Sequence, residues 1–194
     1  MEYAAINTAL GVTALRDFAT DDIEQVARFW HGSGSDFLDF LGIDRGRLGT
    51  LEATRQRFTR AIRTGDPEQS SVAFAITLNG ECVGYTLLNH YTQDVNYSHW
   101  HIINPALRGL GLSTRLYPYR IKTYFDLIPI NRLIHQTRTR NIAVNQMLDH
   151  WVPVAETCYV EKPDGVALPG EFHLRYVLRS DVPRLLDKAG ASGI

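Results

Sequence analysis

The chain has 194 residues, of which 44% are hydrophobic and 21% are charged, a composition typical of a soluble globular domain and not of a disordered chain. Its formal net charge of -1 provides no overall attraction for nucleic acid or for an anionic membrane surface. No apolar run approaches the ~20 residues of a membrane span, and the acidic start at Glu2 differs from a secretory signal. These features predict a cytoplasmic protein with no nucleic-acid partner, no membrane partner and two reduced cysteines, Cys82 and Cys158.

The first predicted elements alternate between strand and helix. Residues 15–19 have the character of a strand, and residues 20–30 that of a helix whose start carries Thr20, Asp21 and Asp22 as capping and acidic side chains. Five glycines lie between residues 31 and 49 among apolar side chains, which predicts a bent segment with one apolar side. A second helix is expected at residues 51–63.

The middle and end of the chain predict a mostly antiparallel sheet. Residues 71–78 and 81–90 alternate apolar and polar side chains around Asn79-Gly80, a pair typical of a type I′ hairpin turn. Further strands are expected at residues 98–103, 132–138, 156–162 and 171–178, and further helices at 114–127 and 142–151. This order predicts a single-domain α/β fold with a mixed sheet flanked by helices. Residues 1–14 are expected to form an N-terminal extension, 15–180 the domain, and 181–194 a loosely held C-terminal tail.

The segment after the strand at residues 98–103 carries the clearest chemical signal. Pro105 marks the strand's exit, and Gly109 and Gly111 have no Cβ, so the backbone can bend sharply before the next helix. Unpaired N–H groups and the helix dipole favour an anion at such a helix start, for example a phosphate or pyrophosphate. The alternative is that the two glycines only make a tight connection. A Walker phosphate loop does not fit, because no Gly-Lys-Ser/Thr follows.

The stretch Arg108-Gly-Leu-Gly-Leu-Ser113 resembles the Arg/Gln-x-x-Gly-x-Gly/Ala signature by which GNAT acetyltransferases hold the pyrophosphate of acetyl-CoA. Ser113 replaces the small apolar residue of that signature. The resemblance covers about residues 15–179 and implies a GNAT-like fold with acetyl-CoA as co-substrate and no metal. The cofactor-binding residues that it implies are Ile103, Arg108, Gly109, Leu110, Gly111, Leu112, Ser113, Thr114 and Asn141.

A second motif begins at Asn141, where Asn-Ile-Ala-Val-Asn is similar to the Asn-x-Ala-x-Asn pattern that opens a helix in ribosomal-protein-type GNAT enzymes. Asn141 can cap this helix, and the family's corresponding asparagine also contacts the pantetheine arm of the cofactor. Both roles are open for Asn141. For Asn145, one turn later, the alternatives are a ligand contact and a position that simply faces solvent.

One position departs from the family. Many GNAT enzymes have a tyrosine seven residues after the first asparagine, where it protonates the leaving CoA thiolate, but this chain has Leu148. Either another donor serves, or the thiolate leaves to solvent, or the protein binds acyl-CoA without turning it over. The substitute donors in the sequence are Tyr117, Tyr119 and His150.

The strand before the turn carries two histidines. Acetyl transfer needs a base to remove a proton from the attacking amine, and histidine suits this near neutral pH. His99 and His101 are two residues apart, so their side chains share one face of the strand while Trp100 points to the other. Arylalkylamine-type GNAT enzymes also carry histidines on this strand, with His99 at a matching position. His99 is the first candidate base, His101 the second, and a water-mediated route the alternative; the family implies a backbone N–H near Ile103 as oxyanion donor.

The acceptor side is less specific. Six arginines lie between residues 45 and 63, and Arg57, Arg60 and Arg63 recur at a spacing that places them on one helical face. They form either a solvated surface or a contact with an acidic acceptor or CoA phosphate. The residues expected to line the acceptor pocket are His31, Phe37, Phe40, Asn89 and Tyr91.

The leading hypothesis is an N-acetyltransferase that moves acetyl from acetyl-CoA to a primary amine of a small molecule or peptide, by direct attack in a ternary complex. The first alternative is a noncatalytic acyl-CoA-binding module, because of Leu148. The second is a longer-chain acyltransferase in which the aromatic segment around Phe37 forms a deeper pocket. A homodimer is compatible with the sequence.

Overall fold

The computed structural model describes residues 1–66, 68–89, 92 and 94–191, and within these residues eight strands form one sheet in the order β1-β2-β3-β4-β5-β6-β8-β7. All neighbouring strands are antiparallel except β5 and β6, which are parallel. The predicted α/β fold with a mixed, mostly antiparallel sheet is therefore confirmed. The strands are β1 (Glu2–Thr8), β2 (Gly11–Asp17), β3 (Ser71–Leu78), β4 (Glu81–Asn89), β5 (Tyr97–Ile102), β6 (Arg132–Arg138), β7 (Glu156–Val160) and β8 (Gly170–Leu178).

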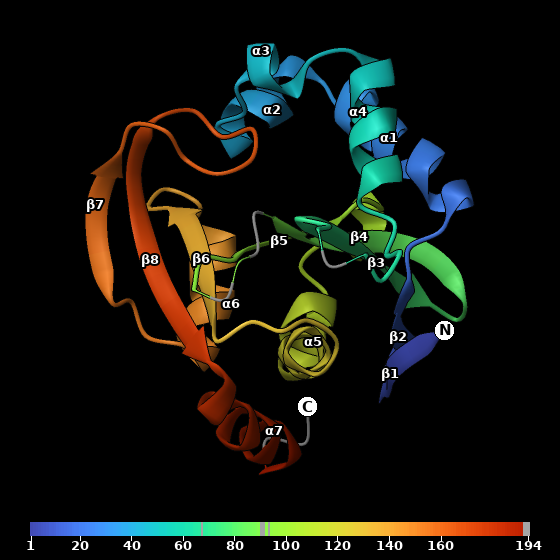
Figure 1. Ribbon diagram of the computed structural model, residues 1–194, viewed down its shortest axis with the longest axis vertical. Coiled ribbons are helices and arrows are strands. Elements are labelled where there is room, and N and C mark those ends of the chain that lie inside the picture. Colours follow the sequence, from blue (N-terminus) through green and yellow to red (C-terminus); the bar gives the residue numbers. More distant parts are fainter. Residues whose placement is uncertain (67, 90–91, 93, 192–194) are drawn as a thin grey trace.

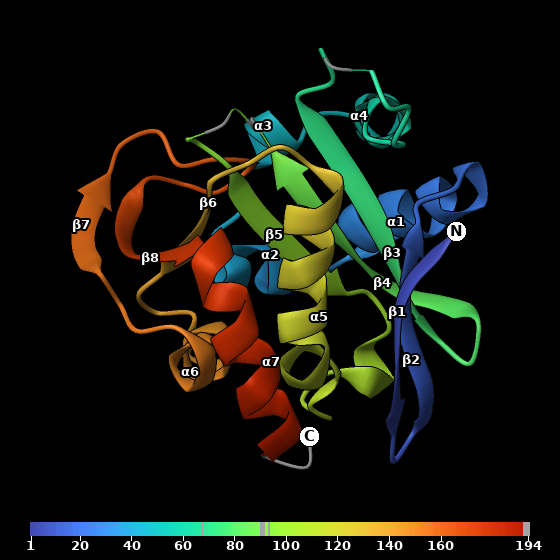
Figure 2. The ribbon, with the colours of Figure 1, turned by 60° about the horizontal axis from the view of Figure 1, so that its bottom comes forward.

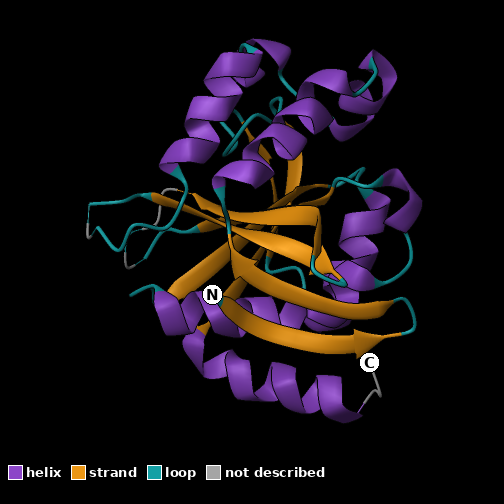
Figure 3. Cartoon of the chain, turned by 90° about the vertical axis from the view of Figure 1, so that its right-hand side faces the viewer, coloured by secondary structure: helices purple, strands orange, loops and turns teal. Residues whose placement is uncertain are grey.

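Helices cover both faces of the sheet (Figures 1 and 3). Helices α1 and α4 pack against β4 and β3 on one face, whereas α5 lies across β1 and β2 on the other, with α7 beside it (Figure 2). The bent segment predicted at residues 31–49 forms two short helices, α2 and α3. The helices are α1 (Thr20–Gly32), α2 (Ser35–Leu41), α3 (Arg45–Leu48), α4 (Leu51–Arg60), α5 (Leu112–Leu127), α6 (Ile142–Trp151) and α7 (Val182–Ala191).

The hairpin of β3 and β4 forms at the predicted turn. Asn79 has φ 51° and Gly80 has φ 86°, the positive values that a type I′ turn requires at both central residues. The Asn79 side chain also accepts a hydrogen bond from the Val12 N–H at 2.9 Å, which ties the turn to the neighbouring strand β2.

Both ends of the chain differ from the prediction. Residues expected to form an extension make β1 and the start of β2, and the Tyr3 ring packs edge-on against Phe74 at 5.6 Å. Residues expected to form a loose tail make α7, in which Leu185 and Ala189 are fully buried. Both elements are ordered because their apolar side chains complete the core around α5.

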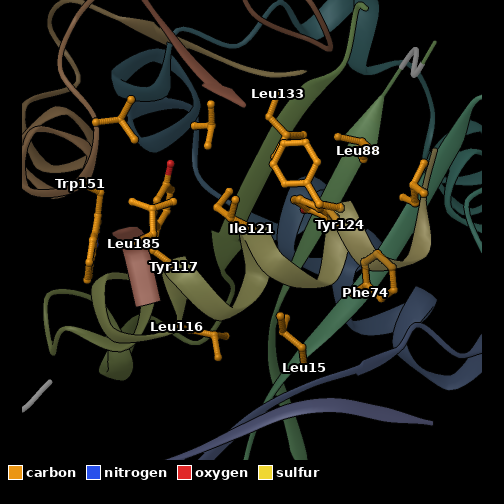
Figure 4. Packing of buried hydrophobic residues seen from close by; sticks show 14 of the residues in the cluster. Leu15, Phe74, Leu88, Leu116, Tyr117, Ile121, Tyr124, Leu133, Trp151 and Leu185 are labelled. Carbon is orange, nitrogen blue, oxygen red and sulfur yellow. The ribbon is translucent and has the colours of Figure 1, made fainter. Parts of the chain in front are cut away.

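Helix α5 organises the larger of two hydrophobic clusters (Figure 4). Tyr117, Ile121 and Tyr124 are fully buried on its inner face. Pro118 lies inside the helix and has no N–H to donate to the Thr114 carbonyl. That carbonyl instead accepts from the Trp151 indole N–H at 3.1 Å, which joins α5 to α6. The second cluster fills the space between the other face of the sheet and α1 to α4.

Strands β5 and β6 pair only at one end. Their register contains a single pair, Tyr97 with Ile134, and the Ile134 N–H donates to the Asn96 carbonyl at 2.7 Å. The backbone edge of β5 from Ser98 onward is therefore not covered by β6. The gap opens toward the end of β5 that leads into the glycine turn.

Candidate active site

A cavity of about 1340 Å³ extends from the gap between β5 and β6 to the helices α1 to α4. It brings together the first turn of α5, the start of α6 and the connection between β7 and β8. Ile103, Leu110 and His31 are not among its lining residues, and Tyr91 lies outside the described residues. The predicted site residues that line it are Phe37, Phe40, Asn89, His99, His101, Arg108, Gly109, Gly111, Leu112, Ser113, Thr114 and Asn141.

The glycine turn has the geometry of an anion cradle. Gly109 and Gly111 have φ values of 76° and 80°, in the left-handed region that glycine adopts without steric cost. Helix α5 begins at Leu112, and the N–H of Arg115 donates to the Gly111 carbonyl at 3.0 Å. The N–H groups of the first turn before Arg115 have no acceptor within the helix. A Cβ built on either glycine would meet no atom within 4 Å, so the space beside the turn is open, and helix-start N–H groups of this kind favour an anion.

Arg108 lines the cavity but does not extend toward this turn. Its Nε donates to the Ile102 carbonyl at 3.0 Å and its Nη2 to the Ile103 carbonyl at 3.2 Å. The guanidinium lies over the rings of Phe37 and Phe29, at 4.6 and 5.5 Å from their centroids. Arg108 therefore anchors the end of β5 to α1 and α2, which differs from the expectation that its charge faces the pyrophosphate.

The backbone N–H expected to stabilise the oxyanion is also engaged. The Ile103 N–H donates to the Val83 carbonyl at 2.9 Å, which directs it toward β4 and away from the gap. Successive residues of a strand direct their N–H groups to opposite neighbours. The N–H of Ile102, which is paired in register with Gly84, therefore faces the gap that β6 leaves open. Among the backbone N–H groups near Ile103, the register with β4 therefore leaves that of Ile102 directed into the gap.

His99 is paired with a buried carboxylate. Its Nε2 lies 2.5 Å from Oδ2 of Asp164, and the exposed fractions of the two side chains are 25% and 4%. Asn89 Nδ2 also donates to Asp164 Oδ2, at 3.2 Å, and the Asp164 N–H donates to the Gln136 side chain at 2.9 Å. In the tautomer with the proton on Nε2, His99 donates to this carboxylate, and Nδ1 is the ring nitrogen left to accept a proton.

Asp164 is the site residue that the sequence analysis missed. It lies in the connection between β7 and β8, which reaches α2 and α3 (Figure 1). The Asp44 N–H donates to the Val166 carbonyl at 2.7 Å, and the Leu168 N–H donates to the Gly42 carbonyl at 2.8 Å. These bonds hold the connection over the cavity. No motif or spacing links Asp164 to His99, which is 65 residues away in sequence.

His101 lies on the same face of β5 as His99, as predicted, but in a different environment. The rings of Trp30 and Tyr85 lie 4.8 and 5.4 Å from it, centroid to centroid. Burial, with smaller contributions from the nearby His99 and Arg108 charges, lowers the pKa of His101 to about 3. His101 is therefore neutral near pH 7 and a poor proton acceptor, which argues against it as the base.

Helix α6 has one side toward the cavity and one side in the core: its cap Asn141 and its residues Ala143, Val144, Gln146, Met147 and His150 line the cavity, whereas Asn145, Leu148 and Trp151 are buried. Asn141 caps the helix, with its side chain accepting from the Val144 N–H at 3.4 Å. Of the alternatives for Asn145, the solvent-facing position does not apply: Asn145 is buried, because its amide joins α6 to the end of β6, where Oδ1 accepts from Thr137 at 2.7 Å. Leu148 is fully buried in the core.

The three candidate proton donors for the CoA thiolate differ in whether they line the cavity. Tyr117 is fully buried, with its hydroxyl 2.8 Å from Nε2 of His135. Neither Tyr117 nor Tyr119 is among the residues that line the cavity, whereas His150 is. His31, expected at the acceptor pocket, instead contacts the Thr54 hydroxyl at 2.8 Å and joins α1 to α4.

The comparisons identify the fold. No protein-family model matches the chain, and a search of curated proteins finds no similar sequence. Among solved structures, Mycobacterium smegmatis RimJ in complex with CoA-disulfide aligns with a TM-score of 0.75 and 15% identity, covering 100% of this chain and 95% of that one. This chain has the fold of the GNAT acetyltransferases.

Two further GNAT structures agree with this identification. Aminoglycoside acetyltransferase AAC(6')-Ib in complex with coenzyme A aligns with a TM-score of 0.66 and 17% identity, covering 89% of this chain and 98% of that one. A GNAT-family acetyltransferase from Bacillus anthracis aligns with a TM-score of 0.64 and 18% identity, covering 93% and 99%. Within the described residues of this GNAT fold, no helix is long and apolar enough to cross a membrane, and no three His, Cys, Asp or Glu side chains are grouped to hold a metal ion.

Proposed function

We propose that this protein is an N-acetyltransferase that transfers acetyl from acetyl-CoA to a primary amine in a ternary complex. The observation that carries the proposal is that one cavity contains both an open glycine cradle and a histidine paired with a buried aspartate. The cradle suits the pyrophosphate of coenzyme A, and the His99–Asp164 pair suits removal of a proton from an amine.

The cofactor would lie along the uncovered edge of β5. The backbone N–H groups from Gly109 to Thr114 hold the pyrophosphate, and Asn141 lies at the cavity wall where the pantetheine arm passes. The N–H of Ile102 then faces the thioester and stabilises the oxyanion as it develops, because a fixed amide donor needs no reorientation.

Asp164 and His99 perform the proton transfer. Asp164 accepts a hydrogen bond from the Nε2–H of His99 and so fixes the ring with Nδ1 available as base. The amine nitrogen attacks the carbonyl carbon, the C–N bond forms, and the C–S bond breaks. Starting from an ammonium group, the nitrogen loses two protons; one ends on the CoA sulfur and the other passes through His99 to solvent.

A release assay for free thiol, with acetyl-CoA and a broad panel of primary amines, tests the proposal. His99→Ala should lose acceptor-dependent thiol release and retain stabilisation by acetyl-CoA. His173→Ala is the matched control, because His173 lies on β8, contacts Thr157 at 2.8 Å and does not line the cavity. Wild-type activity of His99→Ala between pH 6 and 9 would remove His99 as the base.

The position of Leu148 favours a second candidate function, an acyl-CoA-binding protein without turnover. Leu148 is fully buried in the core and does not line the cavity, and leucine has no proton to donate to a thiolate. Stabilisation by acetyl-CoA without thiol release from any amine, and with longer acyl-CoAs equally inert, would support this candidate. Release only with longer acyl-CoAs would indicate the longer-chain acyltransferase.

A further inference from the structure

Three arginines lie together at the end of the cavity away from the glycine turn. Arg47 belongs to α3, and Arg57 and Arg60 lie one turn apart on α4. All three line the cavity. Helices α3 and α4, which carry them, lie on the side of the sheet opposite to α5, whose first turn follows Gly111 (Figures 1 and 2).

Within the described residues, none of these three arginines has a carboxylate within ion-pair distance. Arg57 donates to the backbone carbonyls of Arg47 and Leu48, both at 3.2 Å, and Arg47 donates to the Ala167 carbonyl at 3.1 Å. The other three arginines of the segment are paired: Arg45 with Asp39 at 2.8 Å, Arg55 with Glu24 at 2.9 Å, and Arg63 with Asp17 at 3.2 Å. The uncompensated charge is therefore confined to the arginines that face the cavity.

Arg57 is the least solvent-exposed of the three arginines. It is half-buried, whereas Arg47 and Arg60 are exposed. Burial lowers the pKa of Arg57, and the positive charges of Arg60 and Arg47 act in the same direction. Like charges held together at a partly desolvated site favour an anion between them, and guanidinium groups bind carboxylate and phosphate through paired N–H donors. Glu68, which is exposed, is the carboxylate that lines this end.

The arginine end is connected to the reacting end by a short chain of aromatic contacts. Phe58, next to Arg57 on α4, packs edge-on against Tyr85 at 5.0 Å. Tyr85 in turn stacks on His101 at 5.4 Å. Phe58, Tyr85 and His101 all line the cavity, so one continuous cavity reaches from the arginines to β5.

We propose that the acceptor is an amine that also carries an anionic group, a carboxylate or a phosphate, which binds Arg57 together with Arg60 and Arg47. This inference rests on the proposed acetyltransferase function. It gives the acceptor an anionic group, which polycationic amines such as spermidine lack; the uncompensated arginines repel such polycations.

The test compares acceptors that differ in one charged group. Thiol release from acetyl-CoA is measured with straight-chain ω-amino acids and their amides, with phosphoethanolamine and ethanolamine, and with kanamycin and spermidine. We expect kcat/KM to be at least about tenfold higher for an anionic amine than for its neutral partner, the change that ~1.4 kcal/mol of transition-state binding produces. The amino acids and phosphoethanolamine distinguish a carboxylate from a phosphate as the bound group. Preference for kanamycin or spermidine would overturn the inference.

Variants locate the anion. Arg60→Gln removes a charge whose side chain makes no bond within the described residues, so it should fold normally and lose most of the preference for the anionic amine. Arg57→Lys keeps the positive charge but lacks the paired N–H donors of the guanidinium, so this variant should lose part of the preference for the anionic amine. Arg55→Gln is the matched control on the same helix, because Arg55 pairs with Glu24 and does not line the cavity. An increase in KM for acetyl-CoA in the Arg60 variant, with the acceptor preference unchanged, would assign the arginines to CoA phosphate and overturn the inference.

A binding measurement separates this inference from the proposed function. Calorimetry of the CoA-saturated protein with N-acetylated ω-amino acids and their amides needs no turnover. Anion-dependent binding that Arg60→Gln weakens would support the arginine site even if no amine releases thiol, a result that would remove only the acetyltransferase. Thiol release from neutral amines without any anion preference would preserve the acetyltransferase and overturn the arginine site. Absence of anion-dependent binding and of anion-dependent release would also overturn it.

Discussion

Replacing Gly111 by alanine should remove acetyl-CoA binding at a small, calculable cost in stability. Gly111 has φ 80° and ψ 2°, and a Cβ there would meet no atom within 4 Å, so the cost is that of the left-handed backbone alone. That cost is about 1–2 kcal/mol for an L-residue. For a chain of 194 residues, it corresponds to a decrease in Tm of roughly 2–8 °C.

The assay is thermal unfolding with and without acetyl-CoA. At one hundred times the dissociation constant, the ligand should stabilise the wild type by about 2.7 kcal/mol, or roughly 5–11 °C in Tm. Gly111→Ala should gain almost nothing, because the added methyl group occupies the space above the turn. Gly80→Ala is the matched control: it has φ 86°, no atom within 4 Å of a Cβ, and a place at the hairpin tip outside the cavity.

The two variants should therefore lose similar stability but differ in their response to ligand. A full ligand-induced shift in Gly111→Ala would refute the assignment of the turn as a pyrophosphate cradle. If Gly80→Ala also lost the ligand-induced rise in Tm, backbone strain would explain the loss in both variants, and the added methyl group at Gly111 would not.

Three further predictions concern the pairs that hold the site and the fold. Asp164→Asn should lower kcat by about 100-fold through misorientation of the catalytic base, with KM for acetyl-CoA unchanged; a changed KM alone would contradict this. Burial opposes ionisation of Asp22, but bonds from Arg16 and the backbone outweigh it and lower the pKa of Asp22. The stability that this pair contributes is therefore present above the unfolded pKa of about 3.9 and is lost as the pH falls through the lower folded pKa. Urea unfolding between pH 6 and 2 should show that the free energy of unfolding falls less for Asp22→Asn than for the wild type. Asn145→Ala should lower the free energy of unfolding by about 1–3 kcal/mol, because Arg175 Nη1 loses a buried hydrogen-bond acceptor at 3.0 Å. An unchanged midpoint of urea unfolding would contradict this prediction.

Elements with strong local signals were predicted closely. β3, β6 and α6 have the predicted bounds, 71–78, 132–138 and 142–151. The Asn79-Gly80 turn defines the start of the hairpin, and Asn141 caps α6 through its own side chain. These features depend on residues close in sequence, so they can be recognised without knowledge of the rest of the fold.

The ends of the chain depend on distant contacts. β1 is held by pairing with β2 and by the contact of Tyr3 with Phe74, and α7 by burial of Leu185 against the cluster around α5. Short, weakly patterned segments of this kind gain their stability from packing rather than from intrinsic propensity. Their sequences alone therefore predicted an extension and a tail.

By itself, the sequence determined the parts of the site that are local: a bent glycine turn before a helix, two histidines on one face of a strand, and a capping asparagine. These follow from backbone conformation and from the alternation of side chains along a strand. The tertiary structure decided which groups meet. It brought Asp164 to His99, turned Arg108 toward the carbonyls at the end of β5 and directed the Ile103 N–H to β4. It also left Arg57 and Arg60 at the cavity with no carboxylate of the described residues within ion-pair distance. Strand register and loop packing decide these outcomes, because they are set by contacts between residues far apart in the chain.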